Sequence, residues 1–281
     1  MSTDIYYFSG TGNSLFVAKE LQKRLPESRL RSVVSCMNQK RMRIQASAVG
    51  IVFPVHAITI PIIMKKFIEQ TDFSSADYIF AVATRMGTLF RGFEKIERLL
   101  KRQGKKLNAR FILNMANNEA RHESFSVPTD SEIKELENNV LDKLDLIQDI
   151  VNAKQTSLNE DQEVLIEFGH HLVINTILEK AVLAGMSVCE HTGGVQYFYA
   201  DEKCIGCGIC EKVCLSGKIK MHAKKPVWQR KVMCTMCFAC LNYCPGKAVQ
   251  IKDIPGVKSY TRMNGRYTHP YASVKDIEAQ K

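Results

Sequence analysis

The sequence lacks the features that would place the chain in a membrane or in a secreted disulfide scaffold. Its opening, MSTDIYYFSG, carries no basic stretch and no apolar leader core, so we expect a cytoplasmic protein. The most apolar stretch, Val164 to Met186, is interrupted by charged and polar side chains, which predicts a packed helix and no membrane span. Low-complexity linkers are absent, and the only repeat is a paired cysteine pattern.

Length and composition describe an ordinary globular chain with one unusual feature. At 281 residues, with 45% hydrophobic and 24% charged residues, the chain suits one domain of usual size followed by a smaller one. The unusual feature is cysteine, because eight of the ten cysteines fall between residues 204 and 244. The other two, Cys36 and Cys189, are expected to be small buried hydrophobes.

The eight clustered cysteines repeat one spacing, C-x-x-C-x-x-C-x-x-x-C, at residues 204–214 and 234–244. Disulfides would need an oxidising compartment, and structural zinc, the main alternative, usually takes two separated cysteine pairs. The spacing is that of a bacterial ferredoxin run, in which three close thiolates hold one cluster and the fourth ligates a second one. The runs therefore predict two [4Fe-4S] clusters, held by Cys204, Cys207, Cys210 and Cys244 and by Cys214, Cys234, Cys237 and Cys240.

The amino-terminal half alternates strand and helix signals. Candidate strands occur at residues 4–9, 30–34, 48–54, 78–84 and 110–115. Apolar residues at helical spacing occur at 15–25, 61–70, 90–102 and 133–151. This alternation predicts a parallel sheet covered by helices on both faces, which binds ligands at the carboxyl ends of its strands.

The loop SGTGNS follows the first predicted strand and precedes the first predicted helix. Its residues, Ser9, Gly10, Thr11, Gly12, Asn13 and Ser14, offer backbone N–H groups and hydroxyls to a phosphate at the helix amino terminus. A dinucleotide fingerprint is excluded because Leu15 stands at the third glycine position, and an ATP-type loop is excluded because Asn13 replaces the lysine. The loop resembles the FMN phosphate loop of flavodoxins.

Two later strand ends lie where a flavodoxin sheet places the loops that enclose the flavin ring. They are FPVHAITIP, from Phe53 to Pro61, and ATRMG, from Ala83 to Gly87. This resemblance implies seven further flavin-binding residues: Pro54, Val55, His56, Thr84, Arg85, Met86 and Gly87. For His56 the alternative is a loop histidine without a ligand, and Arg85 faces either the flavin or water.

The whole chain resembles the flavodoxin–ferredoxin fusion family found mainly in anaerobic bacteria and archaea. The resemblance rests on SGTGNS, FYADEKCIGCGICEKVC, KPVWQRKVMCTMCFACLNYCPGKAV and the closing RYTHP. It implies one FMN and two [4Fe-4S] clusters in an electron carrier. The implied organisation is a flavodoxin-like α/β domain with a five-stranded parallel sheet (1–155), a helical connector (156–195), a small α+β dicluster ferredoxin domain (196–252) and a basic C-terminal tail (253–281).

Some residues in the second half are expected to serve structure alone. Trp228, the only tryptophan, is expected to be a packing residue of the ferredoxin hairpin. His170 and His171 are expected to be ordinary helix residues, because no carboxylate or cysteine stands beside them at ligand spacing.

The expected function is electron transfer between FMN, the two clusters and a redox partner. A flavin-dependent reductase of a small substrate and an iron–sulfur redox sensor stay open as alternatives.

The positive charge of the chain lies in its second half. Residues 204–281 hold 14 Lys and Arg against 4 Asp and Glu, whereas the basic and acidic residues before them are equal in number. An acidic redox partner would be attracted to this half, while the alternative is a solvated face made by Lys218, Lys220, Lys224, Lys225, Arg230 and Lys231. No nucleic-acid reading motif accompanies the charge.

Overall fold

The structure is a computed structural model that describes residues 2–38, 42–159, 177, 180, 181, 184, 185, 197–253 and 257–281. The predicted helix at 164–186, with His170 and His171, and Cys189 therefore lie largely or wholly outside the described residues. In the part of the chain that is described, no helix is both long and apolar enough to cross a membrane.

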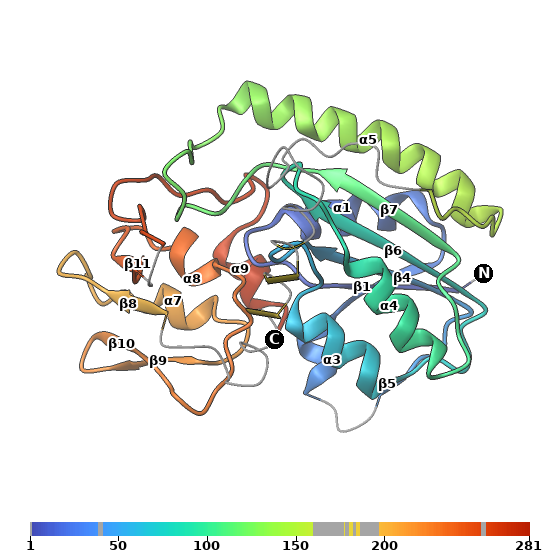
Figure 1. The fold of residues 1–281 in the computed structure, drawn as a ribbon, viewed down its shortest axis with the longest axis horizontal. Coiled ribbons are helices and arrows are strands. Elements are labelled where there is room, and N and C mark those ends of the chain that lie inside the picture. Colours follow the sequence, from blue (N-terminus) through green and yellow to red (C-terminus); the bar gives the residue numbers. More distant parts are fainter. Residues whose placement is uncertain are drawn as a thin grey trace.

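A five-stranded parallel sheet organises the first half of the chain (Figure 1). Its strands are β1 (Thr3–Tyr7), β2 (Ser28–Ser32), β4 (Ala48–Pro54), β6 (Tyr78–Arg85) and β7 (Ala109–Asn114). Their spatial order, β2-β1-β4-β6-β7, is the 2-1-3-4-5 order of flavodoxin-like doubly wound sheets. The predicted α/β fold with five parallel strands is confirmed, and we call residues 2–159 the sheet module.

Helices cover both faces of this sheet. They are α1 (Asn13–Arg24), α2 (Val33–Met37), α3 (Ile62–Gln70), α4 (Gly92–Lys101) and α5 (Asp130–Asn152). Strand side chains alternate between two cores: Ile5 and Tyr7 pack with α1 and α5, while Tyr6 and Phe8 pack with α2, α3 and α4. A short parallel pair, β3 (Met42–Arg43) and β5 (Thr71–Asp72), lies outside the main sheet.

One predicted strand is displaced. The sequence places it at residues 30–34, but β2 ends at Ser32 and a helix begins at Val33. The hydroxyl of Ser32 accepts a hydrogen bond from the backbone N–H of Ser35, which caps that helix. Val33 and Val34 face the apolar core from this helix. The helix cap therefore outweighs the preference of valine for a strand.

The second half forms a small module of short elements, residues 197–253, which we call the cysteine module. It contains β8 (Phe198–Ala200), α7 (Ile209–Lys212), β9 (Ile219–His222), β10 (Lys225–Trp228), α8 (Ala239–Asn242) and β11 (Val249–Ile251). Two antiparallel pairs, β8 with β11 and β9 with β10, hold it together. Trp228 is buried in the core of this module, which confirms its packing role.

The cysteine module sits at the edge of the sheet to which the parallel strands point (Figure 1). Its residues Val213, Leu215 and Ala239 belong to the same apolar core as α3 and α4. The chain then returns to the sheet module and ends in α9 (Val274–Glu278), whose Ile277 also enters that core. The two modules therefore share one continuous core at the ligand-binding edge of the sheet.

Candidate functional site

The predicted phosphate loop forms the turn between β1 and α1. Ser9, Thr11 and Ser14 are each at most 2% exposed. Gly12 is the helix N-cap, with φ of 106°, and it contributes no side-chain cap. The first turn of α1 is thus buried with N–H groups that no capping side chain satisfies. A buried uncapped helix amino terminus favours a bound anion, because the N–H groups and the helix dipole point at it.

Side chains around this loop connect it to the neighbouring strand ends. The Ser14 and Thr84 hydroxyls lie 2.8 Å apart in a hydrogen bond. Asn118, to which sequence reasoning gave no role, donates from Nδ2 to the Thr11 hydroxyl over 2.8 Å. Asn13 donates to the carbonyl oxygen of Ala116. The loop is therefore held against the ends of β6 and β7, as expected of a binding site at the carboxyl edge.

The first predicted ring loop contains a strained turn. His56 and Thr59 exchange two backbone hydrogen bonds of 3.0 Å each. Between them, Ala57 and Ile58 both have left-handed backbones, with φ of 43° and 61°. This conformation is unfavourable for a β-branched residue, yet Ile58 is 2% exposed and held by burial. Strained backbone of this kind concentrates at ligand sites.

His56 carries a buried nitrogen that can still bind something. Its Nδ1 has no hydrogen-bond partner among the described residues. Burial lowers its pKa from 6.5 to about 4, although the nearby Glu119 carboxylate acts in the opposite direction. The imidazole is therefore neutral at pH 7, and a buried unpaired ring nitrogen is a group that a ligand would satisfy.

The second predicted ring loop is joined to the first. The Val55 N–H donates to the carbonyl oxygen of Thr84 over 2.8 Å. Arg85 is 5% exposed and donates from Nε to the side-chain oxygen of Asn114 and from Nη1 to the carbonyl oxygen of Thr88. Its guanidinium is thus directed at protein partners and away from bulk water.

The remaining ring-loop positions differ in exposure and in backbone conformation. Pro54 ends β4 and is half-buried, Met86 is 36% exposed, and Gly87 has a left-handed backbone with φ of 67°. Only glycine adopts such a φ at low cost, so the sequence choice at Gly87 follows from the turn.

The eight clustered cysteines line two separate cavities of the cysteine module. Thiols of the first cavity are Cys204, Cys207, Cys210 and Cys244. Those of the second cavity are Cys214, Cys234, Cys237 and Cys240. Each cavity takes three thiols from one run and the fourth from the other run. The structure thus brings together the two sets of four that the ferredoxin spacing predicts.

Four thiols line the wall of each cavity. Within the described ranges, no three His, Cys, Asp or Glu side chains are grouped so as to hold a metal ion. Burial raises the pKa of Cys210 to about 11 and that of Cys234 to about 12, and neighbouring thiols act in the same direction. Thiolates here would need a compensating positive core. Backbone N–H groups already point at sulfur, from Met236 to Cys234 at 3.4 Å and from Ala248 to Cys244 at 3.2 Å.

The second cavity lies against the phosphate loop. A Cβ atom placed on Gly10 would lie 2.0 Å from the carbonyl oxygen of Cys237. Only glycine allows this approach, and its reason is space, since Gly10 does not have a left-handed backbone. Asn242 adds a hydrogen bond to the carbonyl oxygen of Asn118. The loop and the second cavity are therefore in direct contact.

The C-terminal strap, residues 266–281, closes over the same loop. Tyr267 donates its hydroxyl to the side-chain oxygen of Asn13, and the His269 N–H donates to the carbonyl oxygen of Thr11. A Cβ atom on Gly12 would lie 2.4 Å from the Cβ of Ala272. The strap belongs to the predicted basic tail, for which the sequence gave no binding role, and here it forms one wall of the loop.

The end of the strap fixes the start of the loop. Gln280 is fully buried, and its amide accepts from the Ser9 N–H at 3.0 Å and donates to the Ser9 carbonyl oxygen at 2.8 Å. Ser32 donates its hydroxyl to the Gln280 carbonyl oxygen. These contacts join residues 248 or 271 positions apart, so no local sequence pattern could have predicted them.

The surface charge of the cysteine module is mostly as predicted. Five of the six basic side chains are exposed, which a solvated face and a partner-attracting surface both require: Lys220, Lys224, Lys225, Arg230 and Lys231. Lys218, which the sequence grouped with them, is 2% exposed, so that assignment was wrong. Its methylene stem lies in the apolar interior, and its ammonium donates to backbone carbonyl oxygens in place of water.

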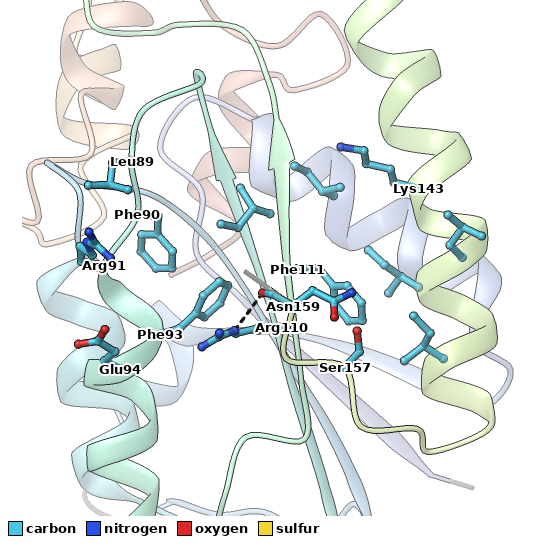
Figure 2. A pocket seen from close by; sticks show the side chains of 15 residues that line it. Leu89, Phe90, Arg91, Phe93, Glu94, Arg110, Phe111, Lys143, Ser157 and Asn159 are labelled. Atoms are coloured by element: carbon cyan, nitrogen blue, oxygen red, sulfur yellow. Dashed lines mark hydrogen bonds between the residues drawn. The ribbon is translucent and has the colours of Figure 1, made fainter. Parts of the chain in front are cut away.

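A further cavity of about 820 Å³ lies outside this site, between α4, the edge strand β7 and α5 (Figure 2). Phe93 and Arg110 form part of its wall, and the guanidinium lies 5.7 Å from the centre of the Phe93 ring. Arg110 also donates to the carbonyl oxygen of Asn159. None of the predicted cofactor residues lines this cavity, so it is separate from the candidate site.

Comparison with known proteins gives a limited result. No protein-family model and no curated protein matches the chain. A protein of Bacteroides uniformis described as a flavoprotein is 18% identical, covering 41% of this chain and 92% of that chain, with a TM-score of 0.33. The rubredoxin oxygen:oxidoreductase of the anaerobe Desulfovibrio gigas is 15% identical, covering 54% of this chain and 36% of that chain, with a TM-score of 0.34. A flavodoxin from the domain Archaea is 14% identical, covering 53% of this chain and 99% of that chain, with a TM-score of 0.34. These similarities are too weak to assign a fold, so the fold assignment rests on the order of the strands in the sheet.

Proposed function

We propose that the protein is an electron-transfer flavo-iron–sulfur protein that holds one FMN and two [4Fe-4S] clusters and exchanges electrons with a redox partner. One observation carries the proposal: two cavities with four thiols each lie in a module that touches the phosphate-type loop of a flavodoxin-like sheet. FMN would supply one- and two-electron chemistry, and the clusters would supply one-electron chemistry.

The thiol sets fit a cubane better than a single metal ion. Four thiolates that each ligate a different iron surround a cluster, whereas ligands of one zinc ion converge within about 2.3 Å of a point. Each cavity is lined by four thiols, three from one run and one from the other, which is the arrangement that the ferredoxin spacing gives for a cubane. The N–H groups directed at Cys234 and Cys244 would stabilise the negative charge on ligating sulfur.

The loop residues fit the phosphate of FMN. Buried N–H groups at the start of α1 would bind the phosphate oxygens, and Thr11 and Ser14 would add hydroxyl donors. His56, with its unpaired Nδ1, would contact the flavin ring. The strap residues Tyr267 and Gln280 would hold the loop in place and keep water from it.

Cofactor content is the direct test of this function. Anaerobically prepared protein should contain about eight irons, about eight acid-labile sulfides and about one FMN per chain, because two cubanes and one phosphate loop require them. Iron and sulfide assays and flavin release on denaturation measure all three. About two irons, or zinc in their place, would refute the cluster assignment, and absence of flavin would refute the loop assignment.

The partner is proposed to be an acidic redox protein that docks at the first cavity. Cys207 is exposed there, Ile205 is 72% exposed, and Lys203, Lys224 and Lys225 are exposed around them. A positive face with an apolar contact point attracts an acidic protein, mainly by raising the association rate.

Electron exchange with an acidic ferredoxin should therefore slow several-fold between about 0.01 M and about 0.15 M salt, since the screening length falls from about 30 Å to about 8 Å. Changing Lys224→Glu together with Lys225→Glu should slow it further at low salt, as measured by stopped-flow absorbance. The matched control is Lys101→Glu with Arg102→Glu, two exposed positions on the other module. Equal rates for the two double variants would refute docking of the acidic partner at this face.

A flavin-dependent reductase is the alternative that one observation favours. His56 is a neutral histidine with an unpaired nitrogen at the strained turn, and it could hold a proton for a small substrate. The two functions differ in the acceptor. A rapid comparison of small-molecule and protein acceptors, each mixed with the reduced protein, separates them.

A further inference from the structure

Lys218 is a buried cation in the wall of the second cavity. It is 2% exposed and lines the cavity together with Cys214, Cys234 and the two remaining thiols of that set. Its Nζ donates to the carbonyl oxygen of Gln229 over 2.9 Å and to that of Val232. In the described part of the chain, no carboxylate forms an ion pair with it. The two carbonyl oxygens accept its hydrogen bonds but do not neutralise its charge, so a negative group held in this cavity would be stabilised by the buried ammonium.

The internal repeat places a lysine at only one of two equivalent positions. Cys214 and Cys244 close the two runs, and the residues four positions later are Lys218 and Ala248. Ala248 lines the first cavity, as Lys218 lines the second. The two halves thus match in their thiols and differ in charge. The cations near the first cavity are more exposed than Lys218: Lys203 in its wall is exposed, and Arg266, which interacts electrostatically with Cys244, is partly exposed and lines neither cavity, so water and salt screen both charges more strongly.

We propose that Lys218 raises the one-electron reduction potential of the group held in the second cavity above that of the group held in the first. The inference rests on the proposed function and deepens it. Reduction adds one negative charge, and a fixed ammonium in a low-dielectric wall stabilises the reduced form over the oxidised form. In the first cavity the equivalent side chain is a methyl group and provides no such stabilisation.

The positions of the two cavities indicate in which direction this difference in reduction potential would drive electrons. The first cavity has a thiol at the surface, Cys207, next to the exposed Ile205, whereas Cys237 in the wall of the second cavity touches the phosphate loop at Gly10. An electron delivered to the first cavity by a one-electron acidic redox protein would move downhill to the second, leaving the first group oxidised. Two successive deliveries match the two electrons that a flavin accepts. This order of potentials favours entry of electrons at the first cavity and their passage towards the phosphate loop.

The test is a redox titration of the anaerobic holoprotein and of Lys218→Met, followed by electron paramagnetic resonance. One cluster should become harder to reduce by about tenfold in its reduced-to-oxidised ratio at a given potential, which is about 59 mV for one electron. The other cluster should change by less than about twofold in that ratio. The control is Lys220→Met, which removes an exposed lysine of β9 that pairs with Glu211 and stands two residues after Lys218, and it should leave both potentials in place.

The outcomes separate this inference from the proposed function. Absence of iron from the unaltered protein refutes the proposed function and the inference with it. A full iron content with no shift in Lys218→Met, or a shift in the cluster perturbed by Cys204→Ser, refutes the inference alone. If Lys218→Met loses iron, the unaltered protein decides: its two potentials must differ, and the higher one must belong to the cluster that Cys234→Ser perturbs. Equal potentials or the reverse assignment would overturn the inference.

Discussion

Replacing Gly10 by alanine is expected to disrupt the contact between the phosphate loop and the second cavity. The added Cβ would lie 2.0 Å from the carbonyl oxygen of Cys237, a distance at which backbone must move. Overpacking of this kind costs about 1 to 3 kcal/mol of folding stability, and here the displaced atoms belong to both proposed cofactor sites. FMN affinity should fall and the spectrum of one cluster should change in the same variant.

Gly104→Ala is the control for this substitution. Gly104 has a left-handed backbone with φ of 68°, but a Cβ there meets nothing within 4 Å. Its cost is therefore that of the backbone conformation alone, and it should leave flavin and iron content unchanged. Flavin fluorescence, iron content and urea unfolding compare the two variants. If Gly10→Ala retains flavin and behaves like Gly104→Ala, the close approach does not couple the two sites.

The parallel sheet and the turn that follows its first strand could be predicted because their signals are local. The unbroken apolar strand from Ala48 to Pro54 was predicted at its observed bounds, since a strand buried on both faces needs no alternation. The SGTGNS loop was found because a turn of small residues between strand and helix is a short-range pattern. The pairing of Cys244 with the Cys204 run followed from a known spacing, and the structure brings those thiols together.

The residues that the sequence missed depend on distant contacts. Gln280 reaches Ser9 across almost the whole chain, and Tyr267 reaches Asn13 in the same way. Neither residue type signals a loop contact by itself. The burial of Lys218 was not predicted for a related reason: lysine is usually exposed, and the carbonyl oxygens of Gln229 and Val232, beyond the β9–β10 hairpin, accept its hydrogen bonds and let it stay buried. Long-range polar contacts produce no periodic pattern from which they could be predicted.

Removal of Cys214 is expected to damage the cluster of the other run. In the structure its thiol lines the second cavity with Cys234, Cys237 and Cys240, although it follows the first run in sequence. Cys214→Ala should therefore lose about one to four irons from the second-cavity cluster and leave the spectrum of the first largely intact. Cys244→Ala should give the mirror result, because its thiol lines the first cavity. Mössbauer and electron paramagnetic resonance spectra of the two variants make the comparison.

Cys36→Ala provides the control for these cysteine variants. Cys36 is buried in the core of the sheet module, outside both runs, so its removal should cost some stability but no iron. The competing arrangement, in which each run of four holds its own cluster, gives the opposite pattern: Cys214→Ala would then damage the cluster of Cys204, Cys207 and Cys210. The wall positions of the thiols favour the crossed arrangement, because the fourth cysteine of each run lies in the cavity of the other. A spectrum in which Cys214→Ala and Cys204→Ser perturb the same cluster would exclude it.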